Sequence, residues 1–401
     1  MNGAKSFLTV ATGLLTGVWC GALVAAETSF QTEVSAETIL FAEPSSAPGE
    51  QRFQPSMTIT PTYRYNRDFG AEVVDVKLFA RLAPERTGRS HLDIRDLAWT
   101  RVFGDFETKV GISRENWGVM ESVQLFDVIN QVDDAESLDN KARLGQPMAR
   151  LSWAQDWGTV TGWVLPYFRR RNFARPASRA FSGGADVDRD RAEFHSPAEE
   201  LYPDLAFRYA HTLGDADIGL GLFRGTDRSP DLIFDPASGR LLPFYDRLTQ
   251  LSFDGQWTGD ALLLKAEALY RDRARGGQSA ALVAGFEYTF FDLDGTGHDL
   301  GVIAELIHDG AGKGQTSFDR DLFSGIRYTF NDVGGGEILA GGFVDLVDGT
   351  TVLRAKYQQR IGNDWKVELI SQAFLNVDRD DLFFARLKDD SFLRINLRYY
   401  F

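Results

Sequence analysis

The residues best suited to do chemistry in this chain are the acids of one long segment, residues 115–146. They include Glu121, Asp127, Asp133 and Asp134, with apolar residues between them. Carboxylates gathered in this way could set the charge of a passage or bind Ca²⁺, which takes several oxygen ligands. Because their spacing does not match an EF-hand loop, we expect no metal site here and interpret the acids as a charged wall.

Catalytic motifs have little support in this sequence. The five histidines are scattered without the spacing of metal ligands. His195-Ser196 stands without the Gly-x-Ser-x-Gly turn that exposes a nucleophilic serine, and without the fuller His-x-Ser-Asn pattern of lipid-cleaving barrels. Gly334-Gly335-Gly336 is not followed by the Lys-Ser/Thr of a phosphate-binding loop. We therefore expect neither enzymatic activity nor a cofactor.

The elements that must position these charges are strands, and the last residues of the chain show the pattern. Leu393, Ile395 and Leu397 alternate with Arg394 and with other polar residues up to Phe401. Side chains on a strand alternate between two faces, so this segment has one apolar and one cationic face. That pattern is typical of a transmembrane barrel strand with lipid on one side and a watery lumen on the other. The aromatic ending, Tyr399 and Phe401, resembles the C-terminal assembly signal of bacterial outer-membrane proteins.

Similar alternation recurs along the chain and predicts an all-β fold. The clearest examples are residues 74–82, 106–113, 282–290, 322–330, 353–358 and 365–369. A soluble β-sandwich also alternates, but here the polar faces carry charges strand after strand and no amphipathic helix covers a sheet. Short turns alternate with longer charged connections at 83–91, 115–146, 170–201, 226–241, 271–279, 310–319, 346–350 and 377–390. Counting back from Phe401, with 34–42 as the first strand, predicts a transmembrane antiparallel β-barrel of 18 strands, and a barrel of 16 strands is the alternative.

The start of the chain predicts export. Lys5, an apolar run over residues 7–24 and the small residues before Glu27 indicate a secretory signal peptide, residues 1–26. A membrane anchor is the alternative, but small and polar residues dilute the run. Cleavage would remove Cys20, the only cysteine, and leave residues 27–401 as one barrel domain without disulfides. The acidic balance, −14 for the whole chain, excludes a generic nucleic-acid binder.

One stretch resembles a known family. A strand that ends in Trp117-Gly118, followed by Asp127-Val128-Ile129-Asn130 and further acids, resembles alginate-export-like porins and related outer-membrane proteins of Gram-negative proteobacteria. The likeness covers residues 92–168, and Gln131 stands where many of those proteins have proline. The resemblance implies a barrel in the cell outer membrane. It assigns no substrate residues.

We expect segment 115–146 to fold into the lumen and narrow it, because a loop with an apolar rib can pack against a wall. An extracellular cap is the alternative. Opposite it we expect a lumenal basic wall, made when closure joins the two ends of the sequence: Lys77, Arg81, Arg354, Lys356, Lys366, Arg394 and Arg398. Opposed charges would create a transverse field that orients charged solutes.

The sequence thus predicts a porin-like channel for passive passage of small polar or charged solutes. The expected partners are these solutes, outer-membrane lipid with lipopolysaccharide, and the barrel-assembly machinery. Three alternatives remain: a lipid-modifying enzyme, an occluded structural or adhesive barrel, and a transporter of hydrophobic compounds, which the charged inward faces disfavour.

Overall fold

The computed structural model describes residues 26–44, 51–125, 128–136, 141–181, 186–312, 315–381 and 383–401. Residues 1–25, most of the predicted signal peptide, lie outside this part of the chain. Cleavage after Ala26 therefore stays a prediction.

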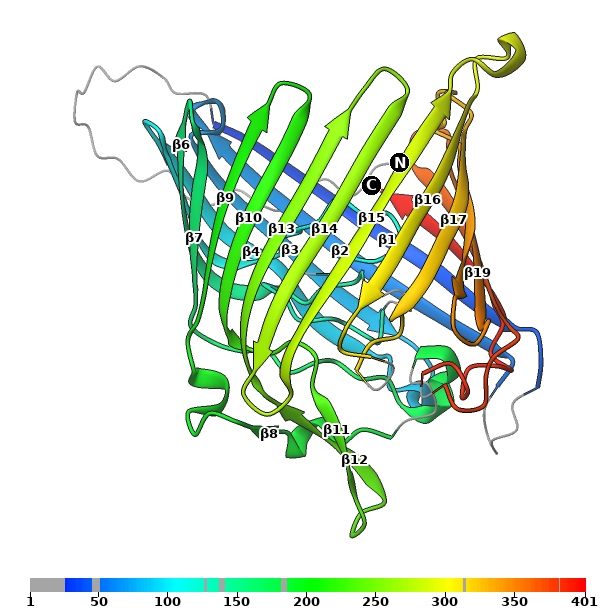
Figure 1. Ribbon diagram of the computed structural model, residues 1–401. Helices are drawn as coiled ribbons and strands as arrows, with labels where there is room; N and C mark the ends of the chain where they lie inside the picture. Colours follow the sequence, from blue (N-terminus) through cyan, green and yellow to red (C-terminus); the bar gives the residue numbers. More distant parts are fainter. Residues whose placement is uncertain are drawn as a thin grey trace, which may run out of the picture.

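Within the described residues, eighteen strands form one closed antiparallel barrel (Figure 1). Each strand pairs with the next one along the barrel, and β21 closes the barrel against β1. The strands are β1 (Ala26–Phe41), β2 (Phe53–Arg67), β3 (Glu72–Leu82), β4 (His91–Phe103), β5 (Phe106–Ser113), β6 (Gln146–Gln155), β7 (Gly158–Leu165), β9 (Asp204–Leu213), β10 (Ala216–Thr226), β13 (Arg247–Thr258), β14 (Leu262–Arg273), β15 (Gly277–Phe290), β16 (Asp299–Asp309), β17 (Arg320–Thr329), β18 (Glu337–Asp345), β19 (Thr351–Ile361), β20 (Trp365–Leu375) and β21 (Phe392–Tyr400). The predicted fold and the count of 18 are confirmed, and the alternative of 16 is wrong.

The remaining described strands form a small sheet beyond the end of the barrel that carries the long loops (Figure 1). In it β12 (Arg240–Tyr245) pairs antiparallel with β11 (Asp231–Asp235) and parallel with β8 (Glu193–Phe194). The long connection predicted over 226–241 is present, but it extends to the start of β13 at Arg247 and contains the β11–β12 hairpin. The prediction of a long connection over 271–279 is wrong, since β14 and β15 stay paired up to Arg273 and Gly277.

In the part of the chain that the structure describes, helical structure is confined to short 3-10 turns. They are η1 (Asp68–Gly70), η2 (Glu85–Thr87), η3 (Pro176–Phe181), η4 (Arg189–Arg191), η5 (Glu199–Leu201) and η6 (Leu293–Gly295). Among the described residues, none of the helices has the length and apolar character needed to cross a membrane.

The barrel turns its apolar side chains outward and its charged ones inward. On β14, Leu264 and Tyr270 are 44% and 42% exposed, whereas Glu267 is fully buried. On β21, Leu393 and Leu397 are similarly exposed, and Asn396 is buried. Soluble proteins bury leucine and expose glutamate. This reversed polarity is the one that suits a barrel surrounded by lipid.

Aromatic rings gather at the end of the barrel that carries the short turns. Phe103, Phe106, Trp153, Trp157 and Tyr209 form a continuous row, with successive ring centroids 5.3–6.2 Å apart. All lie close to turns between neighbouring strands. Aromatic side chains favour the boundary between lipid and water, so this row indicates that the short-turn end of the barrel lies at such a boundary.

Candidate functional site in the barrel lumen

The connection between β5 and β6, residues 114–145, is called the inserted loop, because its described residues (114–125, 128–136 and 141–145) run through the inside of the barrel. The Trp117 ring packs edge-on against Trp163 of β7, with centroids 5.2 Å apart. Ile129 is fully buried in a cluster that includes Phe223 of β10. Met120 is buried among Val283 and other inward side chains of β15 to β17. One loop therefore contacts the inner wall on several different strands.

Two buried carboxylates, on β14 and β16, hold the tip of the inserted loop. Glu267 of β14 accepts the backbone N–H groups of Val119 at 2.6 Å and Met120 at 3.1 Å through Oε1. Glu305 of β16 accepts the N–H groups of Glu121 and Ser122, each at 2.9 Å, and also the Ser122 hydroxyl. Buried backbone N–H groups need partners, and charged acceptors form the stronger hydrogen bonds. These two glutamates fix where the loop tip lies.

Gly118 allows this close approach. Its φ is +112°, a conformation that side chains with a Cβ rarely adopt. A Cβ at this position would lie 2.8 Å from Glu267 Oε1. The glycine of the Trp-Gly motif is thus required where the loop meets the carboxylate.

Asn130 closes the base of the inserted loop. Its Nδ2 donates to the carbonyl oxygens of Ser113 and Leu144, both at 2.9 Å, and its Oδ1 accepts the N–H of Glu115 at 2.8 Å. The side chain is fully buried. The last residue of the Asp-Val-Ile-Asn stretch therefore has a structural role, which is to join the incoming and outgoing ends of the loop.

Three of the four expected acids belong to the described residues and lie in ion pairs, each in different surroundings. Glu121 meets Arg327 of β17, whose Nη2 donates to Oε2 at 2.6 Å, and Lys141 lies 3.9 Å from its other oxygen. Burial alone would raise the pKa of Glu121, but these two cations outweigh it and hold the pKa below its usual range. Asp134 lies 3.3 Å from Arg171. Asp127 falls outside the described residues.

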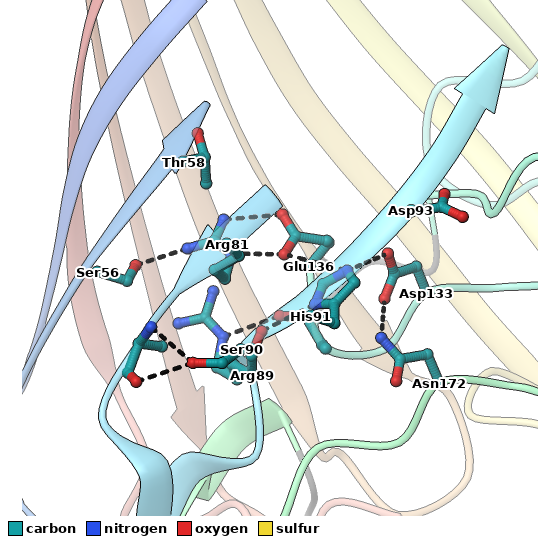
Figure 2. Close-up of polar contacts among 12 residues, drawn as sticks. Ser56, Thr58, Arg81, Arg89, Ser90, His91, Asp93, Asp133, Glu136 and Asn172 are labelled. Carbon is teal, nitrogen blue, oxygen red and sulfur yellow. Dashed lines mark hydrogen bonds and ion pairs between the residues drawn. The ribbon is translucent and has the colours of Figure 1, made fainter. Parts of the chain in front are cut away.

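Asp133 is fully buried and belongs to a polar network on the opposite wall, shown in Figure 2. Its Oδ2 accepts from Arg95 at 2.9 Å and contacts His91 Nε2 at 3.2 Å, while Oδ1 accepts from Asn172 at 2.8 Å. Burial alone would raise the pKa of Asp133, but the hydrogen bond and charge of His91, with Arg95, lower it. The sequence predicted that Asp133 would face the basic wall from across the lumen. That prediction is wrong for Asp133, because this residue is buried within the network.

The same network joins the loop to the basic wall. Arg81 of β3 donates to Glu136 of the loop through Nε and Nη2, and to Ser56 through Nη1 at 2.6 Å (Figure 2). Its Nη1 also donates to Glu37 of β1 at 2.8 Å. Arg89 also donates to Glu37, at 2.8 Å. Three strands and the loop are thereby linked by charge-assisted hydrogen bonds.

A cavity of about 620 Å³ lies between the inserted loop and the basic wall. Five of the seven expected wall residues line it: Arg81, Arg354, Lys356, Arg394 and Arg398. The other two, Lys77 and Lys366, do not belong to its lining. The remaining lining residues are Glu37, Arg95, Asp96, Arg114, Asn116, Glu136, Lys141, Ala142, Arg143, Glu368, Ile370 and Asn396.

In the connection between β7 and β9, residues 166–203, the described part before residue 182 reaches across to β1 and β21 at the long-loop end. Ala174 and Ala180 are buried with Ile39 and Phe41 of β1 and with Phe392 of β21. Arg179, almost fully buried, stacks 4.1 Å from the Phe41 ring and donates to Asp390 at 2.8 Å. This segment therefore narrows the opening at the long-loop end.

The histidine and serine considered for catalysis have separate partners. His195 Nδ1 lies 3.1 Å from Asp246, and the Ser196 hydroxyl accepts the N–H of Ala198 at 3.2 Å. The carboxylates of Asp319, Asp321 and Asp345 lie within 4.8 Å of one another at the long-loop ends of β17 and β18. Asp345 also accepts backbone N–H groups of its own turn, from Val347 at 2.6 Å and Asp348 at 3.0 Å.

At the end of β21, Phe401 continues the pairing with β1. Its N–H donates to the Thr32 carbonyl at 3.0 Å, and its own carbonyl accepts the Thr32 N–H at 2.8 Å. The Tyr399 ring lies 4.7 Å from Trp365 and 5.8 Å from Phe401. Both residues of the expected assembly signal thus lie at the seam where the barrel closes, and their role in assembly stays a prediction.

Comparison with known proteins supports the fold. No family model matches the sequence, and no curated protein matches it. The outer-membrane protein Wzi of Escherichia coli, described as a carbohydrate-binding β-barrel involved in group 1 capsule assembly, aligns over 93% of this chain and 84% of its own, with 9% identity and a TM-score of 0.52. A triple mutant of the porin of Rhodopseudomonas blastica aligns over 94% of this chain and its full length, with 12% identity and a TM-score of 0.46. At this level of identity, the likeness to Wzi shows a shared barrel architecture.

Proposed function

We propose that this chain is an outer-membrane channel through which small polar or charged solutes diffuse past the inserted loop. The observation that carries this proposal is the lumen cavity of about 620 Å³, since its lining is mostly charged. A charged lining retains water, and a hydrated gap is the path that a polar solute needs. Neither a cofactor nor catalysis is part of this proposal.

The inserted loop determines where the passage would run. Its tip is fixed to β14 and β16 by Glu267 and Glu305, and the cavity lies on the other side, along β1, β3, β4 and β19 to β21. Solutes would therefore pass along the basic wall rather than through the centre of the barrel. The loop would be the constriction.

The outward apolar face and the aromatic row support an outer-membrane location for this barrel. In the proposed orientation the short turns and Phe401 face the periplasm, and the long loops face outside. Export through the signal peptide, insertion by the barrel-assembly machinery and contact with lipopolysaccharide belong to the same proposal. So does the likeness to alginate-export-like porins over residues 92–168.

A second candidate is a closed barrel that binds carbohydrate at its outer end. Two observations favour it: residues 166–203 narrow the long-loop end, and Wzi, which shares the architecture, is described as carbohydrate-binding. A lipid-modifying enzyme is less well supported, because His195 and Ser196 contact different partners.

A liposome-swelling assay separates the two candidates. Purified full-length protein in liposomes should admit small uncharged sugars and exclude larger ones, because the loop leaves a narrow gap. Liposomes that stay as impermeable as protein-free controls, although the protein is folded and inserted, would contradict the channel and favour the closed barrel.

A further inference from the structure

We infer that a small pocket at the long-loop rim of the barrel binds a phosphate group of lipopolysaccharide, the lipid of the outer leaflet. The pocket, of about 190 Å³, lies between the start of β4 and the connection that follows β7, and we call it the rim pocket. It shares no lining residue with the lumen cavity. This inference rests on the membrane location and orientation given under the proposed function, but it does not require conduction.

The rim pocket occupies a gap in the barrel wall. β4 pairs with β5 only from Leu97 onward, so among the described strands none continues the pairing beside residues 91–96 on that side. Arg169, from the connection after β7, fills part of this gap. Its Nη1 lies 2.7 Å from Asp93 of β4 and donates to the Gly145 carbonyl oxygen at 2.6 Å. A side chain therefore completes the wall where strand pairing ends.

One side of the rim pocket is apolar and opens on the outer surface of the barrel. Leu92 and Ile94 of β4 are 82% and 38% exposed, whereas Asp93 between them is buried. Since β4 begins at His91, Leu92 is its last outward side chain at the long-loop end. Leu92 lines the pocket together with Tyr167, an aromatic residue that is also exposed. Lipid covers the outward face of such a barrel, and aromatic side chains gather at its edge, so this side lies where acyl chains give way to headgroups.

The other side of the rim pocket is cationic. Its described lining contains three arginines and neither aspartate nor glutamate. Arg189 is exposed and donates through Nη1 to the side-chain oxygen of Asn172 at 2.9 Å, and no carboxylate of the described residues pairs with it. Arg169 uses only Nη1 in the contacts given above. Arg170 is paired with Glu200 and adds no unused donor. Arg189 and Arg169 therefore keep N–H groups for a ligand.

The two sides and the size of the rim pocket indicate the chemical class. Guanidinium groups bind phosphate oxygens in pairs, which gives orientation as well as charge. A volume of about 190 Å³ is below the roughly 300–1,000 Å³ of sites that enclose a whole small molecule. The pocket can therefore hold a phosphate group while the rest of the ligand stays outside, against Leu92. A phosphorylated lipid uses both sides, whereas free phosphate uses only the cationic one.

Native mass spectrometry of the purified full-length protein in detergent tests this inference, because it counts the lipid molecules bound to each barrel. The probes are lipid A with both phosphates, the same lipid after enzymatic dephosphorylation, and inorganic phosphate. The parent should bind phosphorylated lipid A at least tenfold more tightly than the dephosphorylated lipid. Arg189→Gln should weaken binding of phosphorylated lipid A about tenfold, because a charge-assisted contact is lost. Inorganic phosphate at the same concentration should not displace lipid A, since it makes no contact with the apolar side.

Arg191→Gln is the matched control, since Arg191 lies on the same turn, η4, pairs with Asp235 at 2.7 Å and does not line the rim pocket. It should bind lipid A like the parent, and a heat-dependent shift on gels checks that every variant is folded. Equal binding of the two lipids by the parent, or equal loss in Arg191→Gln and Arg189→Gln, would overturn the inference. Displacement of lipid A by inorganic phosphate would make this a site for free phosphate and overturn the assignment to a lipid.

Conductance in a planar bilayer is measured separately, so that failure of the channel proposal is distinguishable. Folded parent that binds phosphorylated lipid A but conducts no current keeps the rim pocket and loses the channel. Folded parent that conducts but does not distinguish the two lipids keeps the channel and loses the rim pocket.

Discussion

Replacing Glu305 by glutamine should release the tip of the inserted loop. The carboxylate accepts two backbone N–H groups, from Glu121 and Ser122, and the Ser122 hydroxyl. A hydrogen bond to a charged group contributes about 1.5–3 kcal/mol. Glutamine keeps one acceptor oxygen, but its NH₂ group would face a backbone donor. Two of the three hydrogen bonds to this side chain are then weakened. Water in the lumen would offset part of the lost free energy by bonding to the same groups.

A net change of about 2–3 kcal/mol would shift the equilibrium between docked and released loop by roughly 30- to 150-fold. Single-channel recording is the suitable assay, because a loop that leaves its wall changes the narrowest section. The parent should conduct at a steady level, and Glu305→Gln should flicker between that level and a larger one. Glu72→Gln is the control, since Glu72 pairs with Arg67 and Arg101 on neighbouring strands near the short turns. A steady current in folded Glu305→Gln, equal to the parent's, would refute the role given to this carboxylate.

Three further predictions follow from the same contacts. Shortening the inserted loop between Met120 and Ala142 should raise single-channel conductance; a shortened protein that inserts normally and conducts like the parent would make the loop an outer cap. Leu397→Asp should reduce the amount of protein in the outer membrane, because it places a charge on the lipid face. Such a charge costs up to about 2–4 kcal/mol at mid-membrane for a basic residue and less for an acidic one. The control, Leu397→Ala, should insert normally. Acid should loosen the inserted loop by protonating Asp133. The pKa of Asp133 is lowered in the folded protein. The stabilisation that its carboxylate provides is therefore complete above the ordinary aspartate pKa near 4 and is lost as the pH falls through the lower folded pKa. Current noise should therefore rise in acid for the parent. An equal rise in Asp133→Asn, which has no carboxylate to protonate, would contradict the role given to Asp133.

The strands could be predicted because their signal is local. Leu393 to Phe401 alternates in the sequence itself, and the alternation of short turns and long connections set the parity that required a first strand near Val34. That strand, β1, begins earlier, at Ala26, since its polar first half pairs with β2 along its whole length. The small sheet of β8, β11 and β12 was missed because β8 is only two residues long and pairs with a segment about fifty residues away.

The site was harder to predict because its contacts join residues far apart in the sequence. Closure brings Arg81 together with Arg394 and Arg398 around one cavity, as the two-ended pattern of basic residues suggested. Which carboxylates would hold the loop could not be foreseen, since Glu267 and Glu305 lie more than 140 residues from the backbone they bind. Their only signal was a charge at an inward, central strand position. The surroundings of Asp133 depend on Asn172, which comes from a different loop.

Single-channel recording of the purified full-length protein in a planar lipid bilayer tests the channel proposal most directly. We expect discrete current steps of uniform size, smaller than an unobstructed barrel of 18 strands would give, because the inserted loop occupies the lumen. In a salt gradient the reversal potential should have the sign of an anion-preferring pore, and the preference should weaken at 1 M salt, where the screening length falls to about 3 Å. Folded and inserted protein that produces no current above the bare bilayer would contradict the proposal.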